Sequence, residues 1–214
     1  MFKPLGDSAL IVQLGDEINP IINQRVHALN GLLQNTNGIL ETIPAYCTLL
    51  VHYDLNFTFG QIKTIVEEKM NQVDEAIKKT PRRLEVPVRY GNASNSDLQT
   101  VSSTLNISIA DVVRIHSEKE YTVYMMGFTP GFPYMGILDA RLNMPRLQTP
   151  RTQVQVGSVA IAGSQTGIYP LDSPGGWHIL GWTPLKIFDP VSKTPFLFSP
   201  GDTVKFIPMD EDNA

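Results

Sequence analysis

The sequence predicts an α+β protein with two domains, and three features of the chain lead to that prediction. Its 214 residues suffice for one large domain or two small ones, and 42% of them are hydrophobic, as in ordinary globular proteins. Strand and helix patterns alternate over the first 80 residues, whereas after Pro81 short apolar runs alternate with glycine and proline turns. We therefore expect an N-terminal domain over residues 1–80 and a β-rich domain over residues 81–214.

The N-terminal domain begins with an apolar run at 8–14 that predicts a strand. A helix is expected over 19–34, because an Asn-Pro pair suits its first positions and apolar residues then recur with helical spacing. Two apolar runs within 38–54 indicate paired strands, and a capping box at Thr58 begins a second helix whose apolar stripe reaches Ile77. With the extended segment at 82–90 as a further strand, this order of elements is that of a split βαβ, ferredoxin-like unit.

The second domain is expected to contain a helix and then mostly β structure. Residues 82–90 form an extended segment, and a capping box at Ser108 begins a helix that reaches His116. Beyond it no helical period lasts longer than a turn, and short β-like runs alternate with turns at 158–162, 185–188 and 203–208. This pattern is typical of a compact β-barrel or sandwich.

Composition excludes several classes of protein. The net charge is −4 without a long basic run, which argues against nucleic acid as the main partner, and no apolar run approaches the roughly 20 residues that span a bilayer. The single cysteine, Cys47, allows no intrachain disulfide and is expected to be an inert core thiol, so we expect a cytoplasmic protein. The phosphate-loop, GxGxxG, HExxH and CxxC motifs are absent, and the four histidines are scattered, so we expect no metal site.

The segment MGFTPGFPYMG, residues 126–136, is the most unusual stretch of the chain. It holds too much glycine and proline for a regular helix or central strand, and too much aromatic surface for an ordinary solvent loop. We expect a stiff turn that presents the rings of Phe128, Phe132 and Tyr134 to a ligand or to another protein.

The segment PRLQTPR places Arg146 and Arg151 each directly behind a proline. The ring of proline fixes φ near −65°, so both arginines leave a stiffened backbone. Guanidinium groups bind carboxylate or phosphate with two parallel hydrogen bonds. Each arginine therefore either binds an anionic ligand or pairs with a nearby acid such as Asp139.

Two further loops carry polar donors and close backbone turns. The first, GSQTGIYP, offers Gln165, Thr166 and Tyr169 to an anionic or amide-bearing ligand, although such loops are more often plain hairpins. The second, SPGGW, turns tightly at Gly176 into Trp177. An exposed tryptophan there would form a contact surface, and a buried one would belong to the core.

His116 and Trp182 are expected to be mainly structural. His116 could transfer a proton, but a residue at the C-terminal end of a helix, favoured by the helix dipole, is the simpler interpretation. Of the two tryptophans, core packing is expected more for Trp182 than for Trp177.

The chain resembles the allophanate hydrolase subunit 1 / KipI family. Five motifs occur in the order seen in that family: GFTPGFPYMGILD, PRLQTPR, VGSVAIAGSQTGIYP, SPGGW and GWTP. The resemblance implies a ferredoxin-like N-terminal domain followed by a cyclophilin-like β-barrel, related to part of the carboxyltransferase domain of urea carboxylase. Two positions depart from the family pattern, since Ile137 replaces a second glycine after Gly136 and Trp182 stands where arginine is common.

The resemblance also implies an activity. Family members act with an A subunit and a homologous C subunit to cleave 5-oxoproline to L-glutamate, driven by ATP hydrolysis, so we expect a subunit that is inactive alone. ATP is then a cofactor of the complex, with Mg²⁺ left open. On this basis the candidate catalytic residues are His116, Tyr134 and Arg151, and the candidate substrate-binding residues are Phe128, Phe132, Arg146, Gln165, Thr166, Tyr169, Gly176 and Trp177.

A regulatory role is the alternative, because the KipI label belongs to inhibitors of a sensor histidine kinase. No chemistry would then occur, and exposed aromatic rings would form a protein-docking cluster, as aromatic residues often do. The rings in question are Phe128, Phe132, Tyr134 and Trp177.

Overall fold

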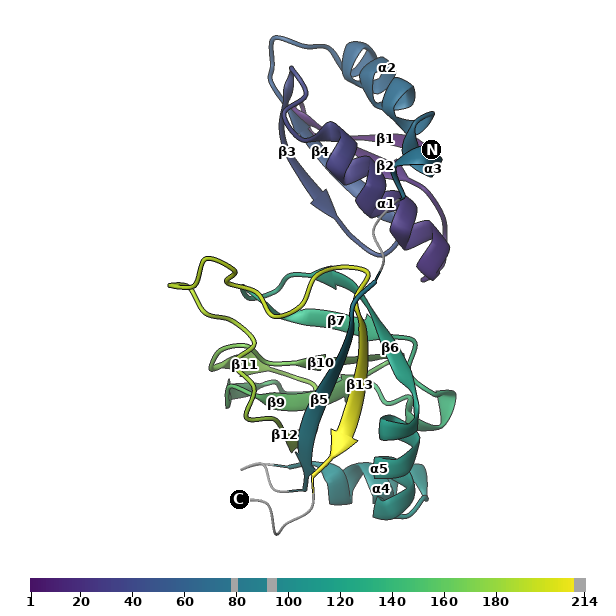
Figure 1. Ribbon diagram of the computed structural model, residues 1–214. Coiled ribbons are helices and arrows are strands. Elements are labelled where there is room, and N and C mark those ends of the chain that lie inside the picture. Colours follow the sequence, from purple (N-terminus) through teal and green to yellow (C-terminus); the bar gives the residue numbers. More distant parts are fainter. Residues whose placement is uncertain (78–80, 92–95, 210–214) are drawn as a thin grey trace. The chain divides into compact units, whose positions relative to one another are not determined.

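The computed structural model describes residues 1–77, 81–91 and 96–209. The chain divides into two compact units, Met1–Thr80 and Pro81–Ala214 (Figure 1). Helices and strands occur in both units, and the second contains a closed barrel, so the predicted α+β class is confirmed. No helix among the described residues is both long and apolar enough to cross a membrane.

The first unit is a four-stranded antiparallel sheet with helices packed against one face. The strand order is β1-β2-β4-β3, and the apolar face of α1 packs through Val26, Leu29 and Leu33 onto inward residues of β2 and β4. The elements are β1 (Phe2–Leu5), β2 (Ala9–Gln13), α1 (Pro20–Leu33), β3 (Ile39–Pro44), β4 (Thr48–Tyr53), α2 (Phe59–Met70) and α3 (Val73–Ala76).

Three expectations for this unit need correction. The fourth strand of the sheet is β1, which the sequence pattern missed because Pro4 interrupts it and its residues are mostly exposed at a sheet edge. The second helix ends at Met70 and a short α3 follows, so Ile77 lies outside the helix. Cys47 is half-buried instead of fully buried, although burial, with the charge of Asp16, still raises the pKa of its thiol.

The second unit is a closed seven-stranded barrel, in the order β10-β7-β6-β13-β5-β12-β9. Its strands are β5 (Arg83–Tyr90), β6 (Glu120–Met126), β7 (Pro133–Gly136), β9 (Ser158–Ala162), β10 (Gln165–Ile168), β12 (His178–Trp182) and β13 (Thr203–Pro208). The predicted extended segment at 82–90 is thus β5, a barrel strand, so its use as the last strand of the ferredoxin-like order was wrong; β1 is the fourth strand of the first sheet. The predicted run at 185–188 forms no strand, and only Phe188 makes an isolated bridge there, to Phe196.

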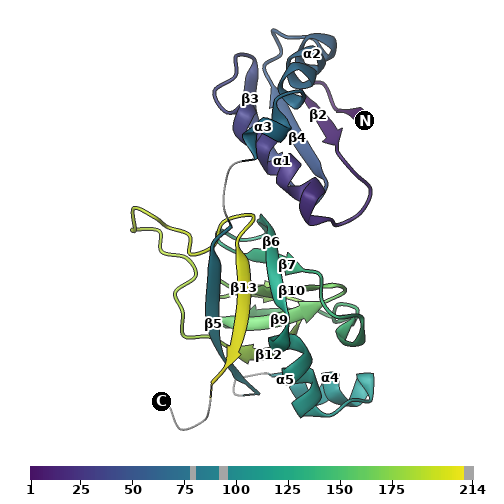
Figure 2. The ribbon, with the colours of Figure 1, turned by 45° about the vertical axis from the view of Figure 1, so that its right-hand side comes forward.

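Short elements complete the second unit. Helices α4 (Leu98–Leu105) and α5 (Ile109–Glu118) lie together at one end of the barrel (Figure 2). The 3-10 turn η1 (Ala140–Leu142) follows β7, and β8 (Arg151–Val154) pairs with β11 (Ser173–Gly175) in a separate two-stranded ribbon.

Strand β9 is buried on both faces, and the candidate site lies beside the apolar cluster on its outer face. Val159 and Ile161 point into the barrel core, whereas Ala160 and Ala162 join a second apolar cluster with Phe132, Tyr169 and Trp177. Because side chains alternate along a strand, this second cluster lies on the outer side of β9. The cluster is one wall of a cavity.

Candidate functional site

A small cavity of about 210 Å³ lies at this second cluster. Most of its lining comes from the segments that the sequence singled out. The lining residues are Phe128, Phe132, Tyr134, Arg146, Pro150, Tyr169, Pro174, Gly175, Gly176 and Trp177. Concave, mostly aromatic pockets with a few polar groups are the usual form of a small-molecule site.

The segment at 127–132 is a rigid double turn. The N–H of Phe132 donates to the carbonyl of Thr129 at 3.1 Å, and Gly131 has φ +87°, so Thr129–Phe132 is a type II turn with Pro130 before the glycine. The N–H of Thr129 donates to the carbonyl of Gly127 at 2.8 Å, which forms a γ-turn centred on residue 128. The sequence thus produces the stiff turn that was expected from its glycines and prolines.

Phe132 is the centre of the aromatic cluster. Its ring is 2% exposed and lies 4.9 Å from the ring of Tyr134, 5.2 Å from that of Tyr169 and 5.4 Å from that of Trp177, measured between centroids. The ring of Phe128 meets it edge-on at 5.8 Å from outside. Edge-to-face packing of this kind holds aromatic side chains in defined orientations. The floor of the cavity is therefore preformed.

Arg146 supplies the charge of the cavity. It is exposed, and within the described part of the chain no carboxylate forms an ion pair with it. Burial raises the pKa of Tyr134, and the positive charge of Arg146 partly offsets that rise. Burial likewise raises the pKa of Tyr169, while a backbone hydrogen bond from Trp177 and the charge of Arg146 act in the opposite direction. A cation thus faces two neutral phenols across an apolar pocket.

Arg151 lies behind the cavity wall and does not line it. Its Nη2 is 2.5 Å from Oδ1 of Asp97, and its Nη1 donates to the carbonyl of Trp177 at 3.3 Å. The local acid that we expected as a partner, Asp139, pairs instead with Arg141. Arg151 therefore supports the position of Trp177. Sequence reasoning missed Asp97, because no local pattern marks its long-range pairing.

His116 is fully buried in the barrel and also does not line the cavity. Its Nδ1 is 2.7 Å from the hydroxyl of Tyr90, and its Nε2 is 2.9 Å from the hydroxyl of Thr166. Thr166 donates its single hydroxyl proton to the carbonyl of Ala160, so it accepts from Nε2, and Nδ1 accepts from Tyr90. Desolvation lowers the pKa of His116 to about 3. Burial in this hydrogen-bonded chain argues against His116 and Thr166 as groups that touch a ligand in this cavity.

The other site predictions divide in the same way. Gln165 is half-buried on β10 and lies outside the cavity lining. Trp177 is 5% exposed, whereas Trp182 is half-buried and donates its indole N–H to the carbonyl of Val156. Trp177 is therefore the more buried of the two tryptophans, the reverse of what we expected. Of the four rings expected in a docking cluster, Phe128 alone is exposed, at 62%.

No group of three or more histidine, cysteine or acidic side chains comes together as a metal site in the described ranges. The cavity lining also contains Pro150, Pro174 and Gly175, which the sequence prediction did not include. Gly175 allows close contact, because a methyl group on it would overlap the hydroxyl of Tyr169. The doubled glycine before Trp177 was the sequence feature that could have indicated this close packing.

In chain order, a four-stranded sheet with helices on one face is followed by a closed seven-stranded barrel. The family model for the carboxyltransferase domain, subdomains C and D, matches residues 1–198, so the chain belongs to this family.

Within this family, the chain is similar over nearly its whole length to subunits of a named enzyme. The chain is 40% identical over 222 residues to the B subunit of 5-oxoprolinase from Bacillus subtilis, covering 98% of this chain and 92% of that protein. It is 36% identical to the B subunit of 5-oxoprolinase from Escherichia coli O157:H7, covering 97% and 95%. The crystal structure of TTHA0988 superposes with a TM-score of 0.82 at 35% identity, covering 98% of this chain but only 40% of that longer chain.

Proposed function

We propose that this chain is the B subunit of an ATP-dependent complex that cleaves 5-oxoproline to L-glutamate. Three relatives at 36–40% identity, aligned over nearly their whole length, are named as the B subunit of 5-oxoprolinase, which supports the proposal. The name also indicates a complex of several subunits, and we propose an A and a C subunit as partners in the cytoplasm. The single structural observation that carries the proposal is Arg146, which lines a preformed aromatic cavity and has no ion pair among the described residues.

The chemistry of the cavity matches a small cyclic anion. 5-Oxoproline is a five-membered lactam with one carboxylate, and Arg146 can bind that carboxylate with two hydrogen bonds. The ring can lie against the faces and edges of Phe132 and Trp177, both almost fully buried. The hydroxyl of Tyr169, which lines the cavity, can donate its proton to the lactam carbonyl.

These residues bind and orient, and they keep water from the ring. A lactam resists hydrolysis, so coupling to ATP makes chemical sense, because phosphoryl transfer to the lactam oxygen would create a better electrophile. Among the described residues that line the cavity, Arg146 is the single cation, a poor match for a triphosphate. We therefore assign ATP to the complex and derive no step through it in this cavity.

The test is reconstitution with single substitutions. The three subunits are co-purified, and glutamate release from 5-oxoproline is measured with and without ATP. We expect no activity from this chain alone. Arg146→Ala in the complex removes a charged hydrogen bond of about 1.5–3 kcal/mol, so kcat/KM should fall roughly 10- to 100-fold, mainly through KM.

Arg114→Ala is the matched control. Arg114 is also an exposed arginine, on α5, and its partners are Asp111 and Glu118 on the same helix. Its substitution should leave the kinetics unchanged. If Arg146→Ala and Arg114→Ala gave the same KM, the cavity would not be the carboxylate site. ATP-dependent turnover by this chain alone would contradict the proposed dependence on partner subunits.

A further inference from the structure

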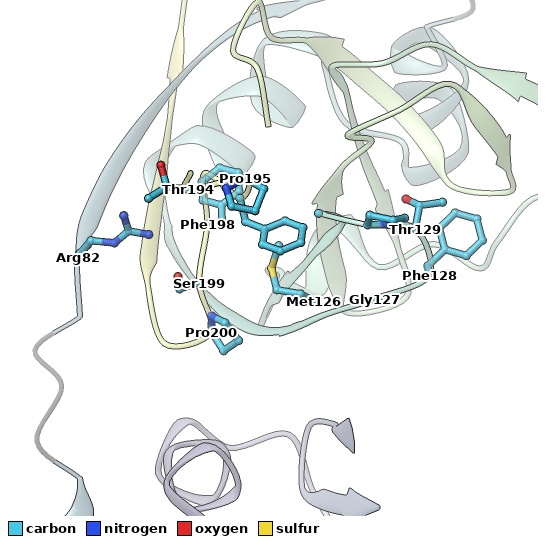
Figure 3. A pocket seen from close by; sticks show the side chains of 13 residues that line it. Arg82, Met126, Gly127, Phe128, Thr129, Thr194, Pro195, Phe198, Ser199 and Pro200 are labelled. Carbon is cyan, nitrogen blue, oxygen red and sulfur yellow. The ribbon is translucent and has the colours of Figure 1, made fainter. Parts of the chain in front are cut away.

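A second, larger cavity adjoins the aromatic one. It measures about 760 Å³ and lies between the turn at 127–131 and the segment at 194–200. Figure 3 shows Phe128 and Thr129 on one side of it, with Thr194, Pro195 and Arg82 toward the other side. Phe128 is the residue that lines both this cavity and the aromatic one. Its ring therefore stands at the boundary between two spaces of very different size.

Phe128 holds this place in a conformation that bulky residues rarely adopt. Its φ is +65°, in the left-handed region that favours glycine, and it is the centre of the γ-turn between Gly127 and Thr129. Strained backbone of this kind persists where the surrounding structure imposes it, and it concentrates at functional sites. The type II turn at Pro130–Gly131 fixes the chain immediately after it.

Core packing does not account for a phenylalanine at this position. Its side chain is 62% exposed, and its aromatic contact is a single edge-to-face approach to Phe132. Glycine would relieve the backbone strain, and a polar residue would suit the exposure. Phe128 contributes to the lining of both the space of about 210 Å³ and the space of about 760 Å³, so its ring is in a position to limit the smaller one.

We propose that Phe128 is a specificity-determining residue whose ring limits the aromatic cavity to small cyclic carboxylates. The turn presents the exposed ring at the margin of the cavity, in edge-on contact with Phe132 of the buried floor. Larger lactam carboxylates are rejected because their substituents would have to pass through the position of the ring. The nature of the ligand rests on the proposed function, whereas the separation of the two cavities does not.

Two lactams test the proposal on the full chain. Trp177 lies in the cavity wall, so a Trp182→Phe background makes its fluorescence a specific reporter of binding. We expect 5-oxoproline to bind at least tenfold more tightly than 1-benzyl-5-oxoproline. Phe128→Ala should reduce that ratio to threefold or less, and Phe128→Gly, which suits φ +65°, should do the same in a fold free of backbone strain.

Phe196→Ala is the control, because Phe196 lines the larger cavity without lining the smaller one. It should preserve the ratio. An unchanged ratio in both Phe128 variants would overturn the proposal.

A ligand-free measurement separates this proposal from the proposed function. Acrylamide quenching of Trp177 should increase in both Phe128 variants and stay at the wild-type level in Phe196→Ala. If neither lactam binds but quenching increases in both Phe128 variants, Phe128 does shield the aromatic cavity and the assigned ligand is wrong. Equal quenching in all variants would mean that the ring of Phe128 does not separate the aromatic cavity from the larger one.

Discussion

Arg151 and Arg146 have the same local sequence context and opposite structural roles, which makes a direct comparison possible. The side chains of Arg151 and Asp97 are 22% and 11% exposed, and the second carboxylate oxygen of Asp97 accepts the N–H of Ile179 at 2.7 Å. Arg151→Ala would leave this carboxylate largely buried without its counter-charge. Removing one partner of a buried pair costs about 3–5 kcal/mol, and the remaining exposure and hydrogen bond reduce this to about 2–3 kcal/mol.

Thermal unfolding followed by tryptophan fluorescence measures this cost. Both tryptophans lie in the second unit, so the signal reports on the barrel and not on the first unit. For a unit of this size, 2–3 kcal/mol corresponds to a decrease in Tm of roughly 8–12 °C. Arg146→Ala removes an exposed side chain with no ion pair among the described residues, and should change Tm by less than about 2 °C.

The double-mutant cycle with Asp97→Ala shows whether the pair itself is responsible. If the interaction is direct, the double variant should be more stable than the sum of the two single changes predicts. Equal Tm values for Arg151→Ala and Arg146→Ala would refute the assignment of Arg151 as a structural residue.

Two further predictions concern buried groups around the cavity. Burial lowers the pKa of His116 from 6.5 to about 3, so between these pH values the unfolded chain binds more protons than the folded chain. The free energy of unfolding should therefore fall as pH decreases through that range, by up to ~1.4 kcal/mol per pH unit. Urea unfolding at pH 7 and pH 5 should show a smaller decrease in this free energy for His116→Gln than for wild type, and equal decreases would contradict a neutral buried histidine. Gly175→Ala should destabilise the barrel by about 1–3 kcal/mol, because the added methyl group overlaps the hydroxyl of Tyr169. Gly176→Ala meets its nearest atom at 3.6 Å and should unfold like wild type, so similar Tm values for the two alanine variants would refute the packing argument.

Local sequence predicted the parts of the site that local geometry controls. The Pro130–Gly131 pair favours a type II turn, and the doubled glycine before Trp177 permits close backbone packing. These constraints act over four or five residues. The aromatic lining of the cavity could therefore be predicted as a set, together with the position of Arg146 beside it.

Residues whose roles depend on distant partners could not be assigned in this way. Asp97 lies 54 positions from Arg151, and His116 lies 50 positions from Thr166. Their pairing is decided by the closure of the barrel, which brings β10, β12 and the helices together. The edge strand β1 was missed for a different reason, because an exposed strand that contains Pro4 shows no apolar alternation.

The packing of the cavity floor against β9 explains how the site can be both rigid and adjustable. One face of β9 packs into the barrel core and the other supports Phe132 and its neighbours, so a change at the floor would disturb the core as well. The margin has no such coupling, since Phe128 and Arg146 are exposed. Substitutions at the margin can therefore alter which anion is bound without a large loss of stability, and we expect differences in ligand preference within this fold to arise at these two positions.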